Sequence, residues 1–175
     1  GQPMTVDDVR QMFGDIPAAE GRAAILNEVL TSPQLPAIAG DICDAIERGE
    51  PVNTQMAHRL AEAFPVAYGD PVLKKCQLAV SEVWVKANEV GHAVGCDLTA
   101  FADYQIPNIL RAMGVLEYAP DLAEAIDGFK PIDYNSGDEQ AIRAASLLAV
   151  EQIAQHLNAP MAAVDHYLWT RRKEA

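Results

Sequence analysis

The chain has 175 residues, of which 50% are hydrophobic, and a formal net charge of −12 at pH 7. This length can bury a core as one domain, and the acidity argues against direct binding of nucleic acid, because neutralising phosphates requires a surplus of Lys and Arg. The longest apolar stretches are too short to cross a membrane, and the first residues lack the order of a signal peptide. We therefore expect a cytoplasmic protein without membrane contact. Gly1-Gln2-Pro3 before Met4 is typical of a cloning remnant, and residues 4–175 are expected to form a single domain.

Helix-boundary residues and helical spacing of apolar residues recur through the first part of the chain. Thr5 can cap the first helix, Pro17 stands where a first helical turn tolerates proline, and Gly49 can end the third. The four helices predicted here cover residues 6–12, 17–30, 41–48 and 54–64.

The clearest helical pattern runs from residue 71 to about residue 90, with Asp70 as its cap and Gly91 at its end. Apolar residues recur along it at spacings of three and four, which predicts one buried stripe. We expect this helix to be central and largely buried, with Trp84 mostly buried, so that its truncation to Ala costs roughly 3–5 kcal/mol. The predicted stripe consists of Leu73, Cys76, Val80, Val83 and Ala87.

The second half of the chain also reads as helices joined by turns. Pro107 disfavours helical conformation at Ile106, which predicts a helix end or bend at residues 103–105 and a short helix over 109–113. Further helices are predicted over 120–127, from Ser136 or Asp138 to residue 157, and in a last segment that carries Val164, Tyr167 and Leu168. Inward positions of the long helix are Ile142, Ala145, Leu148, Ala149 and Ile153. The predicted fold class is all-α, with about eight to ten helices.

Metal and cofactor signatures are missing from the sequence. Cys43, Cys76 and Cys96 lack a close second cysteine or a histidine pair, so we expect reduced thiols and no metal site. No Gly-rich phosphate loop and no Ser-His-Asp order occurs. We therefore expect no cofactor. No sequence feature indicates an oligomeric state.

Two groupings combine a carboxylate with aromatic rings. Residues 101–104 place Asp103 between Phe101 and Tyr104 beside the predicted helix break, and residues 165–169 repeat the theme with Asp165. Aromatic faces stack on heterocyclic bases, and a carboxylate can stabilise positive charge or accept a base N–H. The alternative is that the rings belong to the core and that both aspartates cap helices or form ion pairs.

The run of residues 98–107 resembles the signature of the queuosine-salvage family, enzymes that release queuine from queuosine 5′-phosphate. The family usually has Arg where this chain has Gln105. Further matching motifs, in the family's order and spacing, extend the resemblance over about residues 70–169: they are Lys74-Lys75-Cys76-Gln77, Trp84, Leu110, Gly114-Val115-Leu116, Tyr118, Leu122, Ala141-Ile142-Arg143, Val150-Glu151 and Tyr167-Leu168-Trp169.

The resemblance implies roles for individual residues. Asp103 matches the catalytic aspartate, a nucleophile or a stabiliser of the ribosyl cation, and this fits the oxocarbenium charge that builds when a glycosidic bond breaks. Phe101 matches a residue that lines the base pocket, and Asp165 one that contacts the modified base, whose side arm carries an amine. Tyr104 and His166 are expected beside them. The substrate's 5′-phosphate would need Lys74, Lys75, Arg111 or Arg143 nearby.

The chain also departs from the family. His166 stands where the family often has an aromatic residue, and Thr170 where a second acidic residue usually follows Leu-Trp. The family contributes a histidine from a longer N-terminal region, and we expect this chain to cover little more than the C-terminal half.

Three functions follow from the sequence: an N-glycoside hydrolase acting on a queuosine-type nucleoside or its 5′-phosphate, a non-catalytic module that binds such a nucleoside, and a helical interaction protein whose rings are core. For the first two we expect Asp103 and Asp165 to converge on one cleft that exposes Phe101 or Tyr104. For the third we expect Asp103 to cap a helix on an open surface.

Overall fold

The structure, a computed structural model, describes residues 2–172. Within this range it has ten helices and two strands of two residues each, which confirms the predicted all-α class. The chain divides into two compact units, residues 1–96 and 97–175, and each is described by itself. Among the described residues, no helix combines the length and the apolar character needed to span a bilayer.

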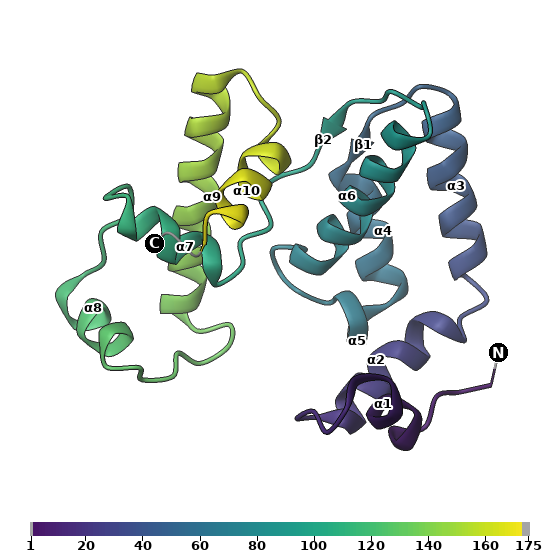
Figure 1. Ribbon diagram of the computed structural model, residues 1–175, viewed down its shortest axis with the longest axis horizontal. Coiled ribbons are helices and arrows are strands. Elements are labelled where there is room, and N and C mark those ends of the chain that lie inside the picture. Colours follow the sequence, from purple (N-terminus) through teal and green to yellow (C-terminus); the bar gives the residue numbers. More distant parts are fainter. Residues whose placement is uncertain (1, 173–175) are drawn as a thin grey trace. The chain divides into compact units, whose positions relative to one another are not determined.

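The first unit consists mainly of six helices (Figure 1). Its elements are α1 (Val6–Phe13), α2 (Ala19–Leu30), α3 (Leu35–Glu47), β1 (Val52–Asn53), α4 (Thr54–Ala63), α5 (Pro65–Tyr68) and α6 (Lys74–Glu89). The strand β2 (Cys96–Asp97) pairs with β1, and Val52 N–H donates to the carbonyl of Gly95 at 3.1 Å.

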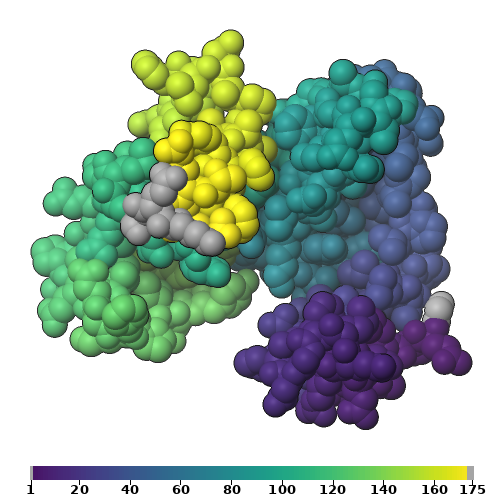
Figure 2. Space-filling view, viewed as in Figure 1, coloured from purple at the N-terminus to yellow at the C-terminus, as the bar shows by residue number. Residues whose placement is uncertain are grey.

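Local caps explain where several of these helices begin. The Thr5 hydroxyl accepts the N–H of Asp8 and the Asp8 carboxylate accepts the N–H of Thr5, which is a complete capping box for α1. The side chain of Asn53 accepts two N–H groups at the start of α4. The side chains of α1 and α2 gather into a rounded cluster, purple in Figure 2, around the buried Val9, Ala19 and Ala23.

The helix α3 begins earlier than predicted. Residues 31–40 were expected to form a turn, but the helix starts at Leu35, with Pro36 in its first turn. A proline is compatible with this position because the first N–H groups of a helix have no intrahelical partner.

The helix α6 packs against α4, α5 and β1. It differs from the prediction in where it starts and in which side chains it buries. It starts at Lys74, because Leu73 adopts a left-handed conformation with φ 55° that separates the turn after Asp70 from the helix. Its buried face is formed by Cys76, Gln77, Val80, Ser81 and Ala87.

Val83 lies outside this face of α6, and its side chain is 37% exposed, so its predicted burial was wrong. The prediction that α6 is largely buried was also wrong, since Leu78 and Val85 are exposed. Trp84 is partly buried, and its indole Nε1–H donates to the carbonyl of Val94 at 2.9 Å. Gln77 and Ser81 are also buried on α6, although both are polar and lie outside the predicted apolar stripe.

The second unit contains α7 (Gln105–Ala112), α8 (Pro120–Asp127), α9 (Gly137–Leu157) and α10 (Met161–Thr170). The helices α7, α9 and α10 pack against one another around an apolar core. Buried members of this core are Ala100, Ile106, Ile109, Leu110, Val150, Ala154, Val164 and Leu168.

Two predictions for the second unit were wrong. The helix α7 starts at Gln105 rather than near Ile109, because Pro107 falls within its first turn, where proline is tolerated. Leu148 was expected to face inward on α9, but it is 58% exposed, and the buried residues are Ser146, Val150 and Ala154. Ser146 fits there because its hydroxyl donates to the carbonyl of Ile142 at 2.8 Å.

Candidate functional site

The segment that precedes α7 is a buried loop in the second unit. Leu98, Ala100, Phe101 and Ala102 are all buried, and Ala102 has a positive φ of 39°. Backbone N–H and C=O groups that are removed from water need hydrogen-bond partners. In this loop, two charged side chains from other helices supply them.

The first of these partners is Asp165, on α10. Its carboxylate Oδ2 accepts the N–H of Phe101 at 2.9 Å, and its side chain is only 3% exposed. The bond joins positions 64 residues apart. It therefore ties the C-terminal helix to the loop that carries Asp103.

The second partner is Arg143, on α9. Its Nε–H donates to the carbonyl of Ala102 at 3.1 Å, and its Nη1 forms an ion pair with Glu139 Oε1, also at 3.1 Å. The side chains of Arg143 and Glu139 are 12% and 24% exposed. Because both side chains are largely shielded from water, their charges are weakly screened and attract each other more strongly than charges at the surface do.

Asp103 is half-buried at the start of α7. Its Oδ1 accepts the N–H of Gln105 at 2.8 Å and that of Ile106 at 3.1 Å, so it caps the helix. Within residues 2–172, Oδ2 of Asp103 has no hydrogen-bond partner. One carboxylate oxygen thus fixes the orientation of the group, and the other is not held by the described residues. A helix cap was the expectation for an interaction protein, but Asp103 is half-buried and does not lie on an open surface.

The aromatic residues of the two groupings differ in exposure. Phe101 is buried, at 8% exposed, whereas Tyr104 is 75% exposed. On α10, His166 is exposed, and the Arg172 guanidinium lies 3.6 Å from the ring centroid of Trp169. Tyr104 is the ring beside Asp103 that a ligand can reach from solvent.

The Lys and Arg side chains that were candidates for binding the substrate's 5′-phosphate differ in their contacts. Lys74 belongs to the first unit, where it is the first residue of α6 and its N–H donates to Asp70 Oδ2 at 2.8 Å. Arg111 forms two hydrogen bonds with Asp127, at 2.6 and 2.9 Å. Arg143 contacts the loop itself. Phe101, Asp103, Tyr104, Arg143, Asp165 and His166 all belong to the second unit.

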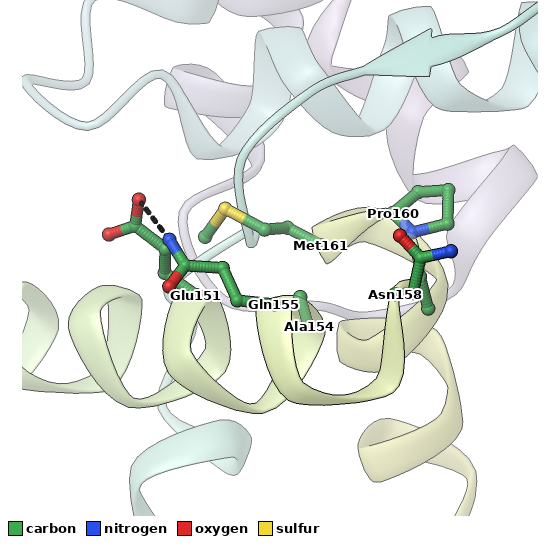
Figure 3. Close-up of a pocket in the computed structure, with 7 residues that line it drawn as sticks. Glu151, Ala154, Gln155, Asn158, Pro160 and Met161 are labelled. Carbon is green, nitrogen blue, oxygen red and sulfur yellow. Dashed lines mark hydrogen bonds between the residues drawn. The ribbon is translucent and has the colours of Figure 1, made fainter.

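A shallow hollow of about 410 Å³ lies where α9 ends and α10 begins (Figure 3). At one end of the hollow, the side chain of Met161 lies above those of Glu151 and Gln155. The Gln155 amide donates to Glu151 Oε1 at 3.4 Å. Asn158 and Pro160 form the other end of the hollow. No residue predicted for the site lines this hollow. Across residues 2–172, no group of three or more His, Cys, Asp or Glu side chains is arranged to hold a metal ion.

Comparison with known proteins identifies the family. A sequence model described as Queuosine salvage protein matches residues 2–175. The chain belongs to the queuosine salvage protein family. The match includes the first unit, whereas the motifs read from the sequence reached back only to about residue 70.

Curated relatives in this family carry the name Queuosine 5′-phosphate N-glycosylase/hydrolase. The protein of Sphaerobacter thermophilus is 33% identical, over 94% of this chain and 55% of its own length. That of Dictyostelium discoideum is 28% identical, over 89% and 52%, and that of Bos taurus 27%, over 86% and 48%. The chain therefore spans about half the length of the curated relatives it matches.

Two residues that shape the loop were not predicted for the site. Glu139 stands four residues before Arg143 on α9, a spacing that could have indicated the ion pair. The left-handed conformation of Ala102 had no sequence signal, because positive φ is expected at Gly or Asn and not at Ala.

Proposed function

We propose that this queuosine-salvage family member hydrolyses the N-glycosidic bond of queuosine 5′-phosphate or a closely related nucleoside and releases the base. The observation that carries the proposal is the state of Asp103: two backbone N–H groups hold one carboxylate oxygen, and the second oxygen has no partner within residues 2–172. The names of the relatives support the choice of substrate. Since such an enzyme acts on free nucleotides, we expect it in the cytoplasm.

The chemistry explains why a fixed carboxylate matters. Hydrolysis breaks the bond between C1′ of the sugar and the base nitrogen, and the electron pair leaves with that nitrogen, which takes up a proton. Water supplies the hydroxyl group that ends on C1′. In the transition state the sugar carries positive charge, and a carboxylate already oriented toward it lowers the barrier. Asp103 would supply the negative charge that stabilises the sugar, either through space or by bonding to C1′.

The other residues would hold the substrate. Tyr104 offers an exposed ring on which the base can stack. Asp165 remains the candidate for the amine of the modified base, and its hydrogen bond to Phe101 keeps it next to the loop that carries Asp103. His166, exposed on α10, remains a candidate for polar contacts to the substrate. The substrate contact expected of Lys74, which belongs to the first unit, stays a prediction.

A binding module without catalysis is the second candidate. It is favoured by one observation: Thr170 stands where the family usually has an acidic residue. Such a module would bind the nucleotide with the same loop and release no base.

Turnover of queuosine 5′-phosphate, followed by chromatography of free queuine, tests the hydrolase. Asp103→Asn retains an oxygen that can accept the two N–H groups but removes the negative charge. We expect it to keep the fold and ligand binding while lowering turnover by about 10²–10³-fold, the effect of losing one well-placed electrostatic group.

Asp103→Ala is the matched variant, because it removes the charge and the cap together. We expect it to lose turnover as well and also to reduce the free energy of unfolding by about 1 kcal/mol. Full activity in both variants would exclude Asp103 from catalysis. Wild-type protein whose melting temperature rises with the nucleotide but that releases no queuine would favour the binding module.

A further inference from the structure

We propose that Arg143 is a positioning residue that holds the Asp103 loop in its reactive conformation, and that it is not a phosphate ligand. The proposal rests on the hydrolase function proposed above. It assigns to Arg143 a task that follows from its contacts with the protein itself.

The contacts of Arg143 fix both ends of its guanidinium. Nε–H donates to the Ala102 carbonyl at 3.1 Å, and Nη1 pairs with Glu139 Oε1 at 3.1 Å. A guanidinium is planar and rigid, so two contacts on different nitrogens define its orientation. Glu139 lies one turn earlier on α9, in the first turn of a helix that Ser136 caps. The anchor is therefore built on a regular helix.

Arg143 binds the loop at Ala102, a residue with an unfavourable backbone conformation. Ala102 has φ 39°, a left-handed conformation that its Cβ disfavours. Such a conformation is energetically costly and persists only where surrounding contacts impose it. Asp165 holds the N–H of Phe101 on one side of this position, and Arg143 holds the carbonyl of Ala102 on the other.

The consequence concerns Asp103, the next residue in the chain. Its carboxylate accepts N–H groups in the first turn of α7, and it directly follows the left-handed conformation of Ala102. If Arg143 is removed, the Ala102 carbonyl loses its donor and the loop can relax toward an ordinary φ. Asp103 would then shift relative to the sugar. A displacement of about 1 Å in a catalytic group can cost about 10²-fold in rate.

The test compares Arg143→Met, Arg143→Lys and wild-type protein in two measurements. Arg143→Met keeps the approximate length and the apolar body of the side chain without its donors, and Arg143→Lys restores the charge with one donor nitrogen in place of three. The control is Arg59→Met, which removes an arginine of the first unit that also pairs with a carboxylate, that of Asp41. The measurements are hydrogen exchange at the amides of Phe101 and Ile106, and kcat and KM for queuosine 5′-phosphate.

For Arg143→Met we expect these amides to exchange about tenfold faster, because one anchoring hydrogen bond is lost. We expect kcat to fall by about 10²-fold with KM changed less than about threefold. Arg143→Lys should lie between this variant and wild type, and Arg59→Met should match wild type in both measurements.

An increase in KM at unchanged kcat would overturn the proposal and make Arg143 a substrate contact. Unchanged hydrogen exchange at the amides of Phe101 and Ile106 would also overturn the proposal. If wild-type protein shows no turnover, the hydrolase function fails, and the exchange measurement alone decides whether Arg143 anchors the loop. If Arg143→Met does not fold, the exchange of Arg143→Lys decides in its place: faster exchange at these two amides supports the anchor, and wild-type exchange overturns it.

Discussion

At the scale of single residues, three charged side chains bond to the backbone of the loop before α7 and of the first turn of α7. Asp165 accepts an N–H, Arg143 donates to a carbonyl, and Asp103 accepts two N–H groups of the helix that follows. A lost partner leaves a buried polar group unsatisfied, which costs about 1–3 kcal/mol. The same contacts that stabilise the loop therefore also determine where the Asp103 carboxylate points.

The three cysteines should differ in reactivity because of their environments. Cys43 is exposed, whereas Cys76 is fully buried on α6, where its thiol donates to the carbonyl of Tyr68 at 3.4 Å. Burial raises the pKa of Cys76 from 9.0 to about 11. In a Cys96→Ser background, we expect a thiol reagent at pH 8 to modify Cys43 quickly and Cys76 only on unfolding. Cys43→Ser should abolish the fast phase; a fast phase that persists would contradict the burial of Cys76.

The direction of the Cys76 pKa shift also gives a pH dependence of stability. Because the folded state holds the thiol proton more tightly than the unfolded state, this group's contribution is fully present below about pH 9. It is lost as the pH rises through about 11. Cys76→Ala should therefore weaken the loss of stability between these pH values, as measured by urea denaturation.

At the scale of elements, the sequence was most informative where caps and periodicity agree. Ser136 starts α9 and Thr5 caps α1, as their sequence positions predict. The pattern failed where apolar residues lie on both sides of a helix, as on α6, because periodicity alone does not tell which side meets neighbouring helices. At the candidate site, the carboxylates and rings could be read from the sequence. The bond between Asp165 and Phe101 could not, since it depends on tertiary packing.

The helix α6 offers a test of which face is buried. Trp84 is half-buried and its Nε1–H bonds to Val94, whereas Val83 is exposed. We expect Trp84→Phe to lower the free energy of unfolding by about 1 kcal/mol through the lost hydrogen bond. Trp84→Ala should cost about 2–3 kcal/mol, below the value for a fully buried ring.

Val83→Ala is the control on the exposed face of α6, and we expect it to change the free energy of unfolding by less than about 0.5 kcal/mol. Urea denaturation of the three variants under identical conditions provides the measurement. Equal losses for Val83→Ala and Trp84→Ala would contradict the placement of Val83 on the exposed face of α6.

At the scale of the whole molecule, charge is the dominant feature. The chain has 25 acidic residues against 13 Lys and Arg. Several of the basic side chains already pair with carboxylates, among them Arg48 with Glu50, Lys86 with Glu89 and Arg111 with Asp127. Binding of a nucleic acid gains most of its free energy from Lys and Arg that displace counterions from phosphates. An acidic surface with paired cations therefore favours a small ligand over a polyanion.

If the proposed hydrolase function holds, this charge predicts that the protein acts on the free nucleotide and not on the same nucleotide within tRNA. At about 0.15 M salt we expect no gel shift with queuosine-containing tRNA, because repulsion opposes the approach of many phosphates. Incubation of the protein with intact tRNA should release no queuine. The same tRNA digested to 5′-nucleotides should yield queuine at the rate found for queuosine 5′-phosphate, so that only chain integrity differs between the two reactions. Release from intact tRNA at a similar rate would contradict this prediction, and it would require a local basic surface that overcomes the net charge of −12.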